Sequence, residues 1–169
     1  MSYIMLLTWG HTIISLIALF LGIPVIAAML GGRVSNPWTK WFLIFAIACT
    51  VTGFMFPFGG VTPAFATGLV ASAVFAVVLV AAYVFHYTGH WRWLYAGGVV
   101  ISVYLLAFVG VVQAFLKVPF VNALAPTQTE LPFLVAQIGV LVAFVVLGIL
   151  SAIKFKGAIA RGSLSPPSS

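Results

Sequence analysis

Five long apolar stretches, separated by short polar connections, dominate the sequence. They cover residues 4–30, 41–57, 63–86, 93–116 and 132–154. An α-helix needs about 20 apolar residues to cross the hydrocarbon core of a lipid bilayer. The strands of a membrane barrel would instead alternate apolar and polar residues over about ten positions. The pattern therefore predicts an all-α polytopic membrane protein, with a bundle of five transmembrane helices in residues 1–156 and a disordered tail in residues 157–169.

The composition agrees with a lipid environment. The chain has 169 residues, of which 64% are apolar and 5% are charged, and Glu130 is the single acidic residue. A soluble domain carries about 25% charged residues, so this chain could not cover an ordinary water-exposed surface. The formal net charge is +6, but the basic residues stand singly between apolar stretches, which argues against a nucleic-acid partner. Cys49 is the only cysteine, so an intramolecular disulfide and a thiolate metal cluster are excluded.

The distribution of basic residues predicts the orientation of the bundle. Cytoplasmic connections of membrane proteins carry an excess of Lys and Arg. One side of the predicted bundle holds Arg33, Lys40, Arg92, Lys154, Lys156 and Arg161, and the other side holds Lys117. We therefore expect the N-terminus outside and the C-terminus in the cytoplasm. No basic residue precedes the first apolar stretch, which indicates a retained helix rather than a cleaved signal peptide.

Tryptophans gather at the predicted cytoplasmic boundary. Their amphipathic rings favour the interface between membrane and water, and a neighbouring cation can contact lipid phosphates. We interpret five residues as a lipid-interface belt: Trp38, Trp41, Trp91, Arg92 and Trp93. This belt lies on the side that carries the basic residues, in agreement with the predicted orientation.

Small residues predict where helices approach one another closely. In lipid, helices associate through close packing and a few polar contacts, so small side chains favour contact. The third stretch has a small residue at every fourth position, namely Ala64, Gly68, Ser72 and Ala76. We expect this stripe to make the third helix the packing centre of the bundle, or alternatively to form an interface between copies of the chain. Gly98 and Ser102 form a shorter stripe on the fourth helix.

Rare polar residues in the outer half of the predicted bundle form a candidate ligand site. His11 lies roughly 10 Å along the first helix, and polar residues of three other helices reach a similar depth. The candidate residues are His11, Thr50, Thr52, Gln113 and Gln137, with Trp9, Phe54 and Phe56 as aromatic walls. An ionisable group inside a membrane is a functional hypothesis by default. We expect a pocket for a lipophilic ligand such as a quinone, or an axial position for haem b; alternatively, His11 pairs with a glutamine and fixes the packing.

Other chemistry finds less support in the sequence. His86 and His90 are four residues apart, but no carboxylate or cysteine lies near them to complete a metal site. A catalytic triad needs an acid, and Glu130 has no histidine near it in the sequence. We therefore predict neither catalytic residues nor a metal site.

Four stretches resemble a family of small uncharacterised proteobacterial inner-membrane proteins. They are TGFMFPF at 52–58, WRWLY at 91–95, VVQAFLKVP at 111–119 and ALAPTQTELPF at 123–133. Members of that family tend to carry a histidine after the Phe-Pro-Phe turn, where this chain has Gly59 and Gly60. The resemblance implies a multi-pass protein of the bacterial inner (plasma) membrane and implies no activity.

These features together favour a non-enzymatic membrane protein. We expect either an accessory subunit of a membrane complex, with partner proteins in the bilayer, or a binder of a small lipophilic ligand. The alternative is a redox protein that binds haem or quinone at the candidate polar residues. A third hypothesis is a channel or carrier for a small neutral solute.

Overall fold

The computed structural model describes residues 2–33 and 36–162, with side chains up to Ile153. This part of the chain is helical and contains no strand, in agreement with the predicted all-α fold. Its helices are α1 (Tyr3–Leu30), α2 (Pro37–Phe54), α3 (Pro63–Leu79), the π-helical turn η1 (Val80–Val84), α4 (Trp91–Lys117), α5 (Pro119–Asn122) and α6 (Leu131–Gly162). Five spans are long and apolar enough to cross a membrane, and α3 with η1 forms one of them.

Two helix boundaries differ by four residues or more from those expected. α2 begins at Pro37, because the Asn36 side chain accepts a hydrogen bond from the Thr39 backbone N–H (3.1 Å) and Pro37 fits the first helical position. α6 continues to Gly162, so the predicted disordered tail begins too early. Ala158 and Ala160 favour a helix, and the helix ends at a glycine, a residue that commonly follows the last helical turn. Residues 163–169 lie outside the described part.

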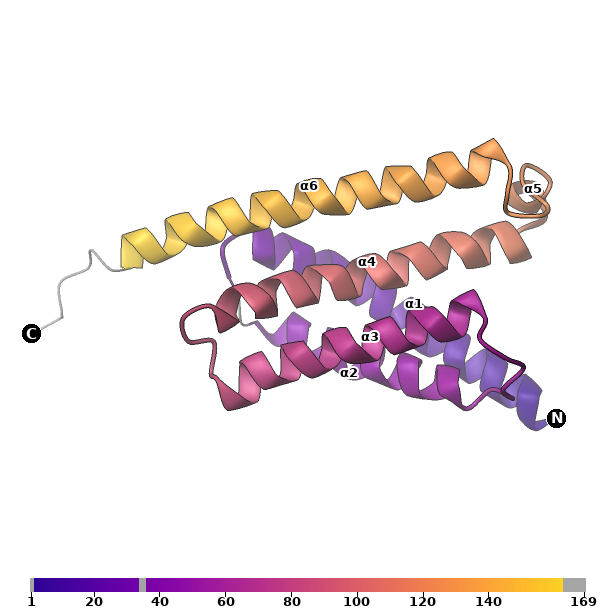
Figure 1. The fold of residues 1–169 in the computed structure, drawn as a ribbon, viewed down its shortest axis with the longest axis horizontal. Coiled ribbons are helices and arrows are strands. Elements are labelled where there is room, and N and C mark those ends of the chain that lie inside the picture. The colour runs from indigo at the N-terminus through magenta and orange to yellow at the C-terminus, as the bar shows by residue number, and fades with distance from the viewer. Residues whose placement is uncertain (1, 34–35, 163–169) are drawn as a thin grey trace, which may run out of the picture.

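The long helices run side by side, and their connections lie at two opposite ends (Figure 1). The N-terminus, the connection from α2 to α3 and the short helix α5 lie at one end, which we call the N-terminal end. The connections from α1 to α2 and from α3 to α4 lie at the other end, which we call the C-terminal end because α6 finishes there. Successive connections thus alternate between the two ends, as they would in a chain that crosses a membrane five times.

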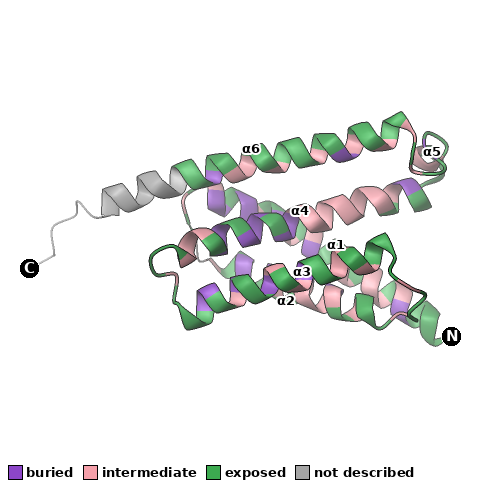
Figure 2. Cartoon of the chain, viewed as in Figure 1, coloured by how far each residue is buried: buried purple, intermediate pink, exposed green. Residues whose placement is uncertain are grey.

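α4 lies at the centre of the packing. It contacts α1, α2, α3, α5 and α6, whereas α3 contacts α2 and α4 among the long helices. Buried residues accordingly concentrate on α1 and on the first half of α4 (Figure 2). The expectation that the third helix would be the packing centre is therefore wrong. α3 turns Ala71, Phe75 and Val78 toward the core.

The predicted stripe of small residues on α3 is only partly covered. Ala64 and Ala76 are exposed, while Gly68 and Ser72 are half-buried. A side chain added to Gly68 would come within 3.1 Å of the Phe54 ring, so this glycine makes room for α2. The use of the stripe as an interface between copies stays a prediction.

Two other glycines allow close helix crossings. A Cβ added to Gly98 of α4 would lie 2.5 Å from Val78 Cγ2, and one added to Gly22 of α1 would lie 2.7 Å from Val103 Cγ1. Both distances are shorter than a carbon–carbon contact allows, so each backbone approaches its neighbour only because the Cβ is missing. Gly98 is part of the shorter stripe expected on the fourth helix, and its partner Ser102 is buried.

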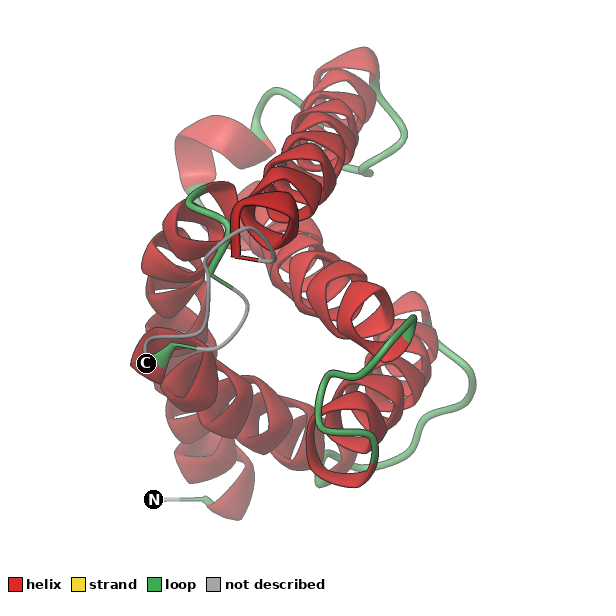
Figure 3. Ribbon diagram, turned by 90° about the vertical axis from the view of Figure 1, so that its left-hand side faces the viewer, coloured by secondary structure: helices red, strands yellow, loops and turns green. Residues whose placement is uncertain are grey.

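α6 lies at the edge of the bundle. Among the other long helices it contacts α4 and α1, and it is exposed along most of its length (Figure 2). In the nearly end-on view of Figure 3, the helix that leads to the C-terminus lies at the margin of the group. Within its apolar span Leu131–Ile153, two residues are buried inside the protein, Gln137 and Ser151.

Candidate functional site

His11 forms a cross-helix hydrogen bond with one other predicted site residue, Thr52. The distance from His11 Nδ1 to Thr52 Oγ1 is 2.9 Å, and the bond joins α1 to α2. The Thr52 hydroxyl also lies 2.9 Å from the Ala48 carbonyl oxygen and 3.0 Å from that of Cys49. Because the Thr52 hydroxyl has two carbonyl acceptors on its own helix, we assign Nδ1–H of His11 as the donor to Thr52, a tautomer that leaves the lone pair on Nε2. The imidazole and the Phe56 ring form a T-shaped pair, with ring centroids 5.5 Å apart.

The other predicted site residues do not join this pair. Thr50 lies two residues from Thr52, on the opposite side of α2, and donates to the Ala46 carbonyl (3.1 Å). Gln113 is exposed. Gln137 is buried between α6 and α4, where its Nε2 donates to the Phe108 carbonyl (3.3 Å). The expected pairing of His11 with a glutamine is therefore not found, because Thr52 takes that place.

Of the predicted aromatic walls, only Phe56 lies against His11. Phe54 packs edge-on against Phe65 of α3, with centroids 5.5 Å apart. Trp9 is 59% exposed on α1. The His11–Thr52 pair is thus a contact between two helices and is not enclosed by the layer of five polar residues that the sequence suggested.

The predicted interface belt is divided between two environments at the C-terminal end. Trp38 and Trp41 are more than half exposed. Trp91 stacks on Phe85, with centroids 3.9 Å apart and the rings nearly parallel, and Arg92 beside it is half-buried. Trp93 is half-buried and faces the space between α4 and α6. His86 and His90 are exposed at this end, and no cluster of metal-ligating side chains occurs among the described residues.

The connection from α4 to α6 is a compact, internally bonded turn. Glu130 Oε1 accepts from the backbone N–H (3.1 Å) and hydroxyl (2.8 Å) of Thr127, and Oε2 accepts from the Thr129 N–H (3.1 Å). Partial desolvation raises the pKa of the Glu130 carboxyl, while these hydrogen bonds lower it, and the net shift is downward. Asn122 and Gln128 donate to carbonyls at the end of α4, Phe115 and Val112. The polar residues of this connection therefore stabilise the turn itself.

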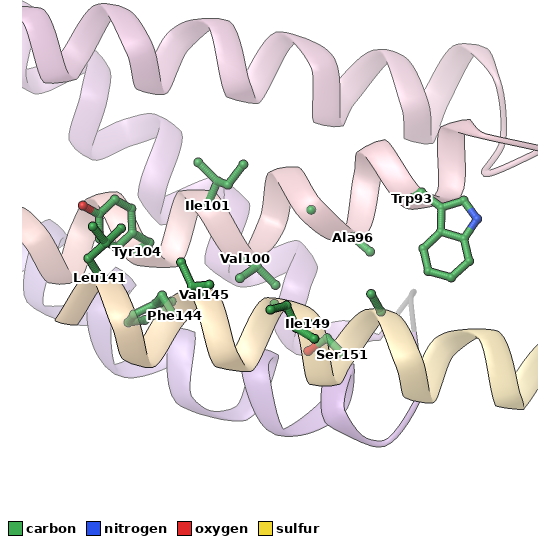
Figure 4. Close-up of a pocket in the computed structure, with 13 residues that line it drawn as sticks. Trp93, Ala96, Val100, Ile101, Tyr104, Leu141, Phe144, Val145, Ile149 and Ser151 are labelled. Atoms are coloured by element: carbon green, nitrogen blue, oxygen red, sulfur yellow. The ribbon is translucent and has the colours of Figure 1, made fainter. Parts of the chain in front are cut away.

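A groove lies between α4 and α6 (Figure 4). Its volume is about 480 Å³. Apolar side chains form most of its walls, and Tyr104 and Trp93 are among the lining residues that carry a polar atom (Figure 4). The lining residues are Trp93, Ala96, Gly97, Val100, Ile101 and Tyr104 of α4 and Leu141, Phe144, Val145, Gly148, Ile149, Ser151 and Ala152 of α6. A second space of about 400 Å³ lies on the other flank of α6, against α1 and α4.

Two buried polar atoms without a hydrogen-bond partner occur in the described part of the chain, and both belong to α6. They are Ser151 Oγ, on a residue that is 4% exposed, and Gln137 Oε1, on a residue that is 9% exposed. Buried polar groups are nearly always paired, so such atoms indicate a missing partner. Ser151 is among the residues that line the α4–α6 groove, but its Oγ is covered by protein atoms and does not face the hollow.

Sequence reasoning missed this groove. Gly97, Gly148, Ser151 and Ala152 are the small residues that open it, and each lies in a stretch that reads as an ordinary apolar helix. Their spacing marks a small face on each helix, but the sequence does not tell which two faces meet.

No family model, curated protein or solved structure matches the chain. The class of the protein is thus described by its fold and its groove. The described residues form a helical bundle with five apolar spans and a groove between α4 and α6.

Proposed function

We propose that the chain is a multi-pass protein of the bacterial inner membrane, with its N-terminus outside and its C-terminus in the cytoplasm. Five apolar spans support insertion. Arg33, Lys40 and Arg92 lie at the C-terminal end, whereas Lys117 lies at the N-terminal end. The excess of basic residues in cytoplasmic connections gives the direction. Lys154, Lys156 and Arg161 would strengthen this asymmetry, but their side chains lie outside the described part.

Within that membrane, the protein binds a lipophilic molecule in the α4–α6 groove and performs no chemistry on it. The single observation that carries this proposal is the groove itself, whose volume of about 480 Å³ falls in the range of small-molecule sites. Mostly apolar walls with a few polar atoms are typical of such sites.

Two neighbouring glycines of α4, Gly97 and Gly98, have different surroundings. At Gly98, the missing Cβ allows α3 to approach, as small residues in membrane helices usually do. At Gly97, a Cβ would meet nothing within 4 Å, although small residues of α6 lie across the groove. Gly97 is exposed, so the space beside it opens on the surface of the bundle and leaves room there for an apolar molecule.

The other functional hypotheses lack a comparable observation. Nε2 of His11 offers a lone pair to a quinol or a haem iron, but Thr52 and Phe56 surround the ring with an ordinary helix contact. An accessory role in a larger complex, a redox role and a role as a carrier of a neutral solute stay predictions.

Native mass spectrometry of the protein, extracted from its own membrane in mild detergent, tests the binding proposal. Gly97→Leu fills the groove without a backbone clash, because the space beside Gly97 is open. Gly139→Leu is the matched control, since Gly139 of α6 is exposed, has open space around it and does not line the groove. We expect the native protein and the control to retain a bound lipophilic mass, and Gly97→Leu to lose most of it. Equal retention by all three, or no bound mass on the native protein, would contradict the proposal.

A further inference from the structure

The C-terminal end of the bundle carries positive charge that no acidic side chain of the protein balances. Arg33 follows α1, Lys40 lies at the start of α2 and Arg92 at the start of α4, all at this end (Figure 1). Glu130 is the single acidic residue of the chain, and it lies in the connection from α4 to α6 at the opposite end. Side chains of this protein therefore cannot supply the counter-charge of these three cations.

The three cations lie where the apolar spans end. Arg92 is the second residue of its span, Lys40 is the fourth residue of another, and Arg33 follows the end of a third by three residues. At about 1.5 Å per residue, the Cα atoms of Arg92 and Lys40 are within about 6 Å of the ends of their spans. Long basic side chains extend from such positions toward the lipid head groups. The counter-charge is therefore expected at the level of lipid phosphates.

Tryptophans surround these cations and favour a lipid over a soluble partner. Trp38 and Trp41 are more than half exposed at the start of α2, on the same helix as Lys40. Trp91 and Arg92 are neighbours at the start of α4, and both are half-buried. Indole rings favour the interface between membrane and water. A soluble acidic partner would meet cations in water beyond this interface, whereas a lipid head group lies at the same level as the rings.

We propose that Arg33, Lys40 and Arg92 form a basic surface that binds the phosphate of an anionic membrane glycerophospholipid. This inference goes beyond the proposed function, because it does not depend on what occupies the α4–α6 groove. The planar guanidinium of Arg92 suits a two-point contact with phosphate oxygens. Arg33 and Lys40 are exposed and add an attraction that weakens as the ionic strength rises. Given the proposed orientation, the lipid belongs to the cytoplasmic leaflet, whose surface is negatively charged.

Two lipids with the same acyl chains test the basic surface. Phosphatidylglycerol is anionic, whereas phosphatidylcholine has the same phosphate and esters but is neutral overall. Each is titrated into delipidated protein in mild detergent at fixed ionic strength, and the bound fraction is read by native mass spectrometry. We expect the native protein to prefer phosphatidylglycerol. Arg92→Gln and Lys40→Gln should each reduce this preference about five-fold, the ratio that one basic residue near an anionic surface provides.

Three further variants separate charge from folding and from the groove. Arg92→Lys keeps the positive charge and should retain most of the preference. Lys117→Gln removes an exposed cation at the N-terminal end and should retain all of it. Gly97→Leu fills the groove and should also keep the preference, so this test is independent of the proposed function. Because Lys40 is exposed, Lys40→Gln shows the effect of charge without a change in packing.

Four results would overturn the proposal. They are equal binding of the two lipids by the native protein, an unchanged preference in both Arg92→Gln and Lys40→Gln, a loss in Lys117→Gln as large as in Arg92→Gln, and displacement of the lipid by inorganic phosphate at constant ionic strength. The last result would identify a site for free phosphate. An acidic protein that stays bound after extraction from the native membrane, and is lost from Arg92→Gln, would likewise replace the lipid as the partner of this surface.

Discussion

At the scale of residues, the two partners of the His11–Thr52 hydrogen bond should contribute unequally to the stability of the fold. If His11 is replaced, Thr52 keeps its hydrogen bonds to the backbone of α2. If Thr52 is replaced, the imidazole Nδ1 loses the partner that lies 2.9 Å away. A polar group left unpaired in an apolar setting costs more than the loss of the bond itself.

Thr52→Val should therefore destabilise the protein by about 1 kcal/mol, and His11→Leu by less. The free energy of unfolding, measured by titration with a denaturing detergent and followed by circular dichroism, checks this. Thr50→Val is the matched control on the same helix, since Thr50 bonds only to its own helix and should cost little. A larger loss for His11→Leu than for Thr52→Val would contradict the assigned roles.

Glu130 makes the stability of the outer turn depend on pH. Hydrogen bonds from Thr127 and Thr129 lower the pKa of this carboxyl in the folded protein, against the effect of desolvation. The stabilisation is therefore fully present above the ordinary glutamate pKa and is lost as the pH falls through the lowered folded value. Amide hydrogen exchange at Thr127 and Thr129 should accelerate over that acidic interval. Glu130→Gln should remove the pH dependence, and a native protein whose exchange, corrected for its intrinsic pH dependence, stays constant would contradict the account.

At the scale of elements, the crossing of α3 and α4 depends on one glycine. A Cβ at position 98 would lie 2.5 Å from Val78, which is fully buried and branched at Cβ, so it cannot move aside easily. Gly98→Ala should separate the helices and cost about 1–3 kcal/mol. Gly97→Ala is the neighbouring control, where the space is open and a better helix former should be neutral or slightly stabilising. Detergent unfolding of the two variants compares them directly, and similar stabilities would contradict the close crossing.

The helices also show what the sequence can and cannot predict. The number and approximate range of the spans follow from hydropathy, because lipid requires about 20 apolar residues per crossing. The rotation of each helix does not follow, since a span that is apolar on all sides carries no pattern to mark its inner face. Depth therefore placed Gln113 and Thr50 beside His11, whereas rotation turns Gln113 outward and Thr50 away. The groove depends on which faces of α4 and α6 meet, and that is decided only by the packed bundle.

At the scale of the whole molecule, the proposed orientation can be read from cysteine labelling. Cys49 is 9% exposed, so the native protein gives little background. Leu124→Cys places an exposed thiol at the N-terminal end, and His90→Cys places one at the C-terminal end. In intact spheroplasts, a membrane-impermeant maleimide should label Leu124→Cys, and should label His90→Cys only after permeabilisation. The reverse pattern would contradict the N-out, C-in orientation.

The α4–α6 groove is the feature on which the functional account depends. The groove, the second space against α1 and α4, and the two unpaired polar atoms of the described residues all involve α6, the helix at the edge of the bundle. An alternative is that α6 packs tightly against α4 in a bilayer, with Ser151 turned to the carbonyl of Leu147 as other helical serines are.

A structure determined in a lipid nanodisc distinguishes these arrangements most directly. The account predicts an ordered, elongated density between α4 and α6, running from Trp93 to Tyr104. A closed α4–α6 interface without that density would contradict it.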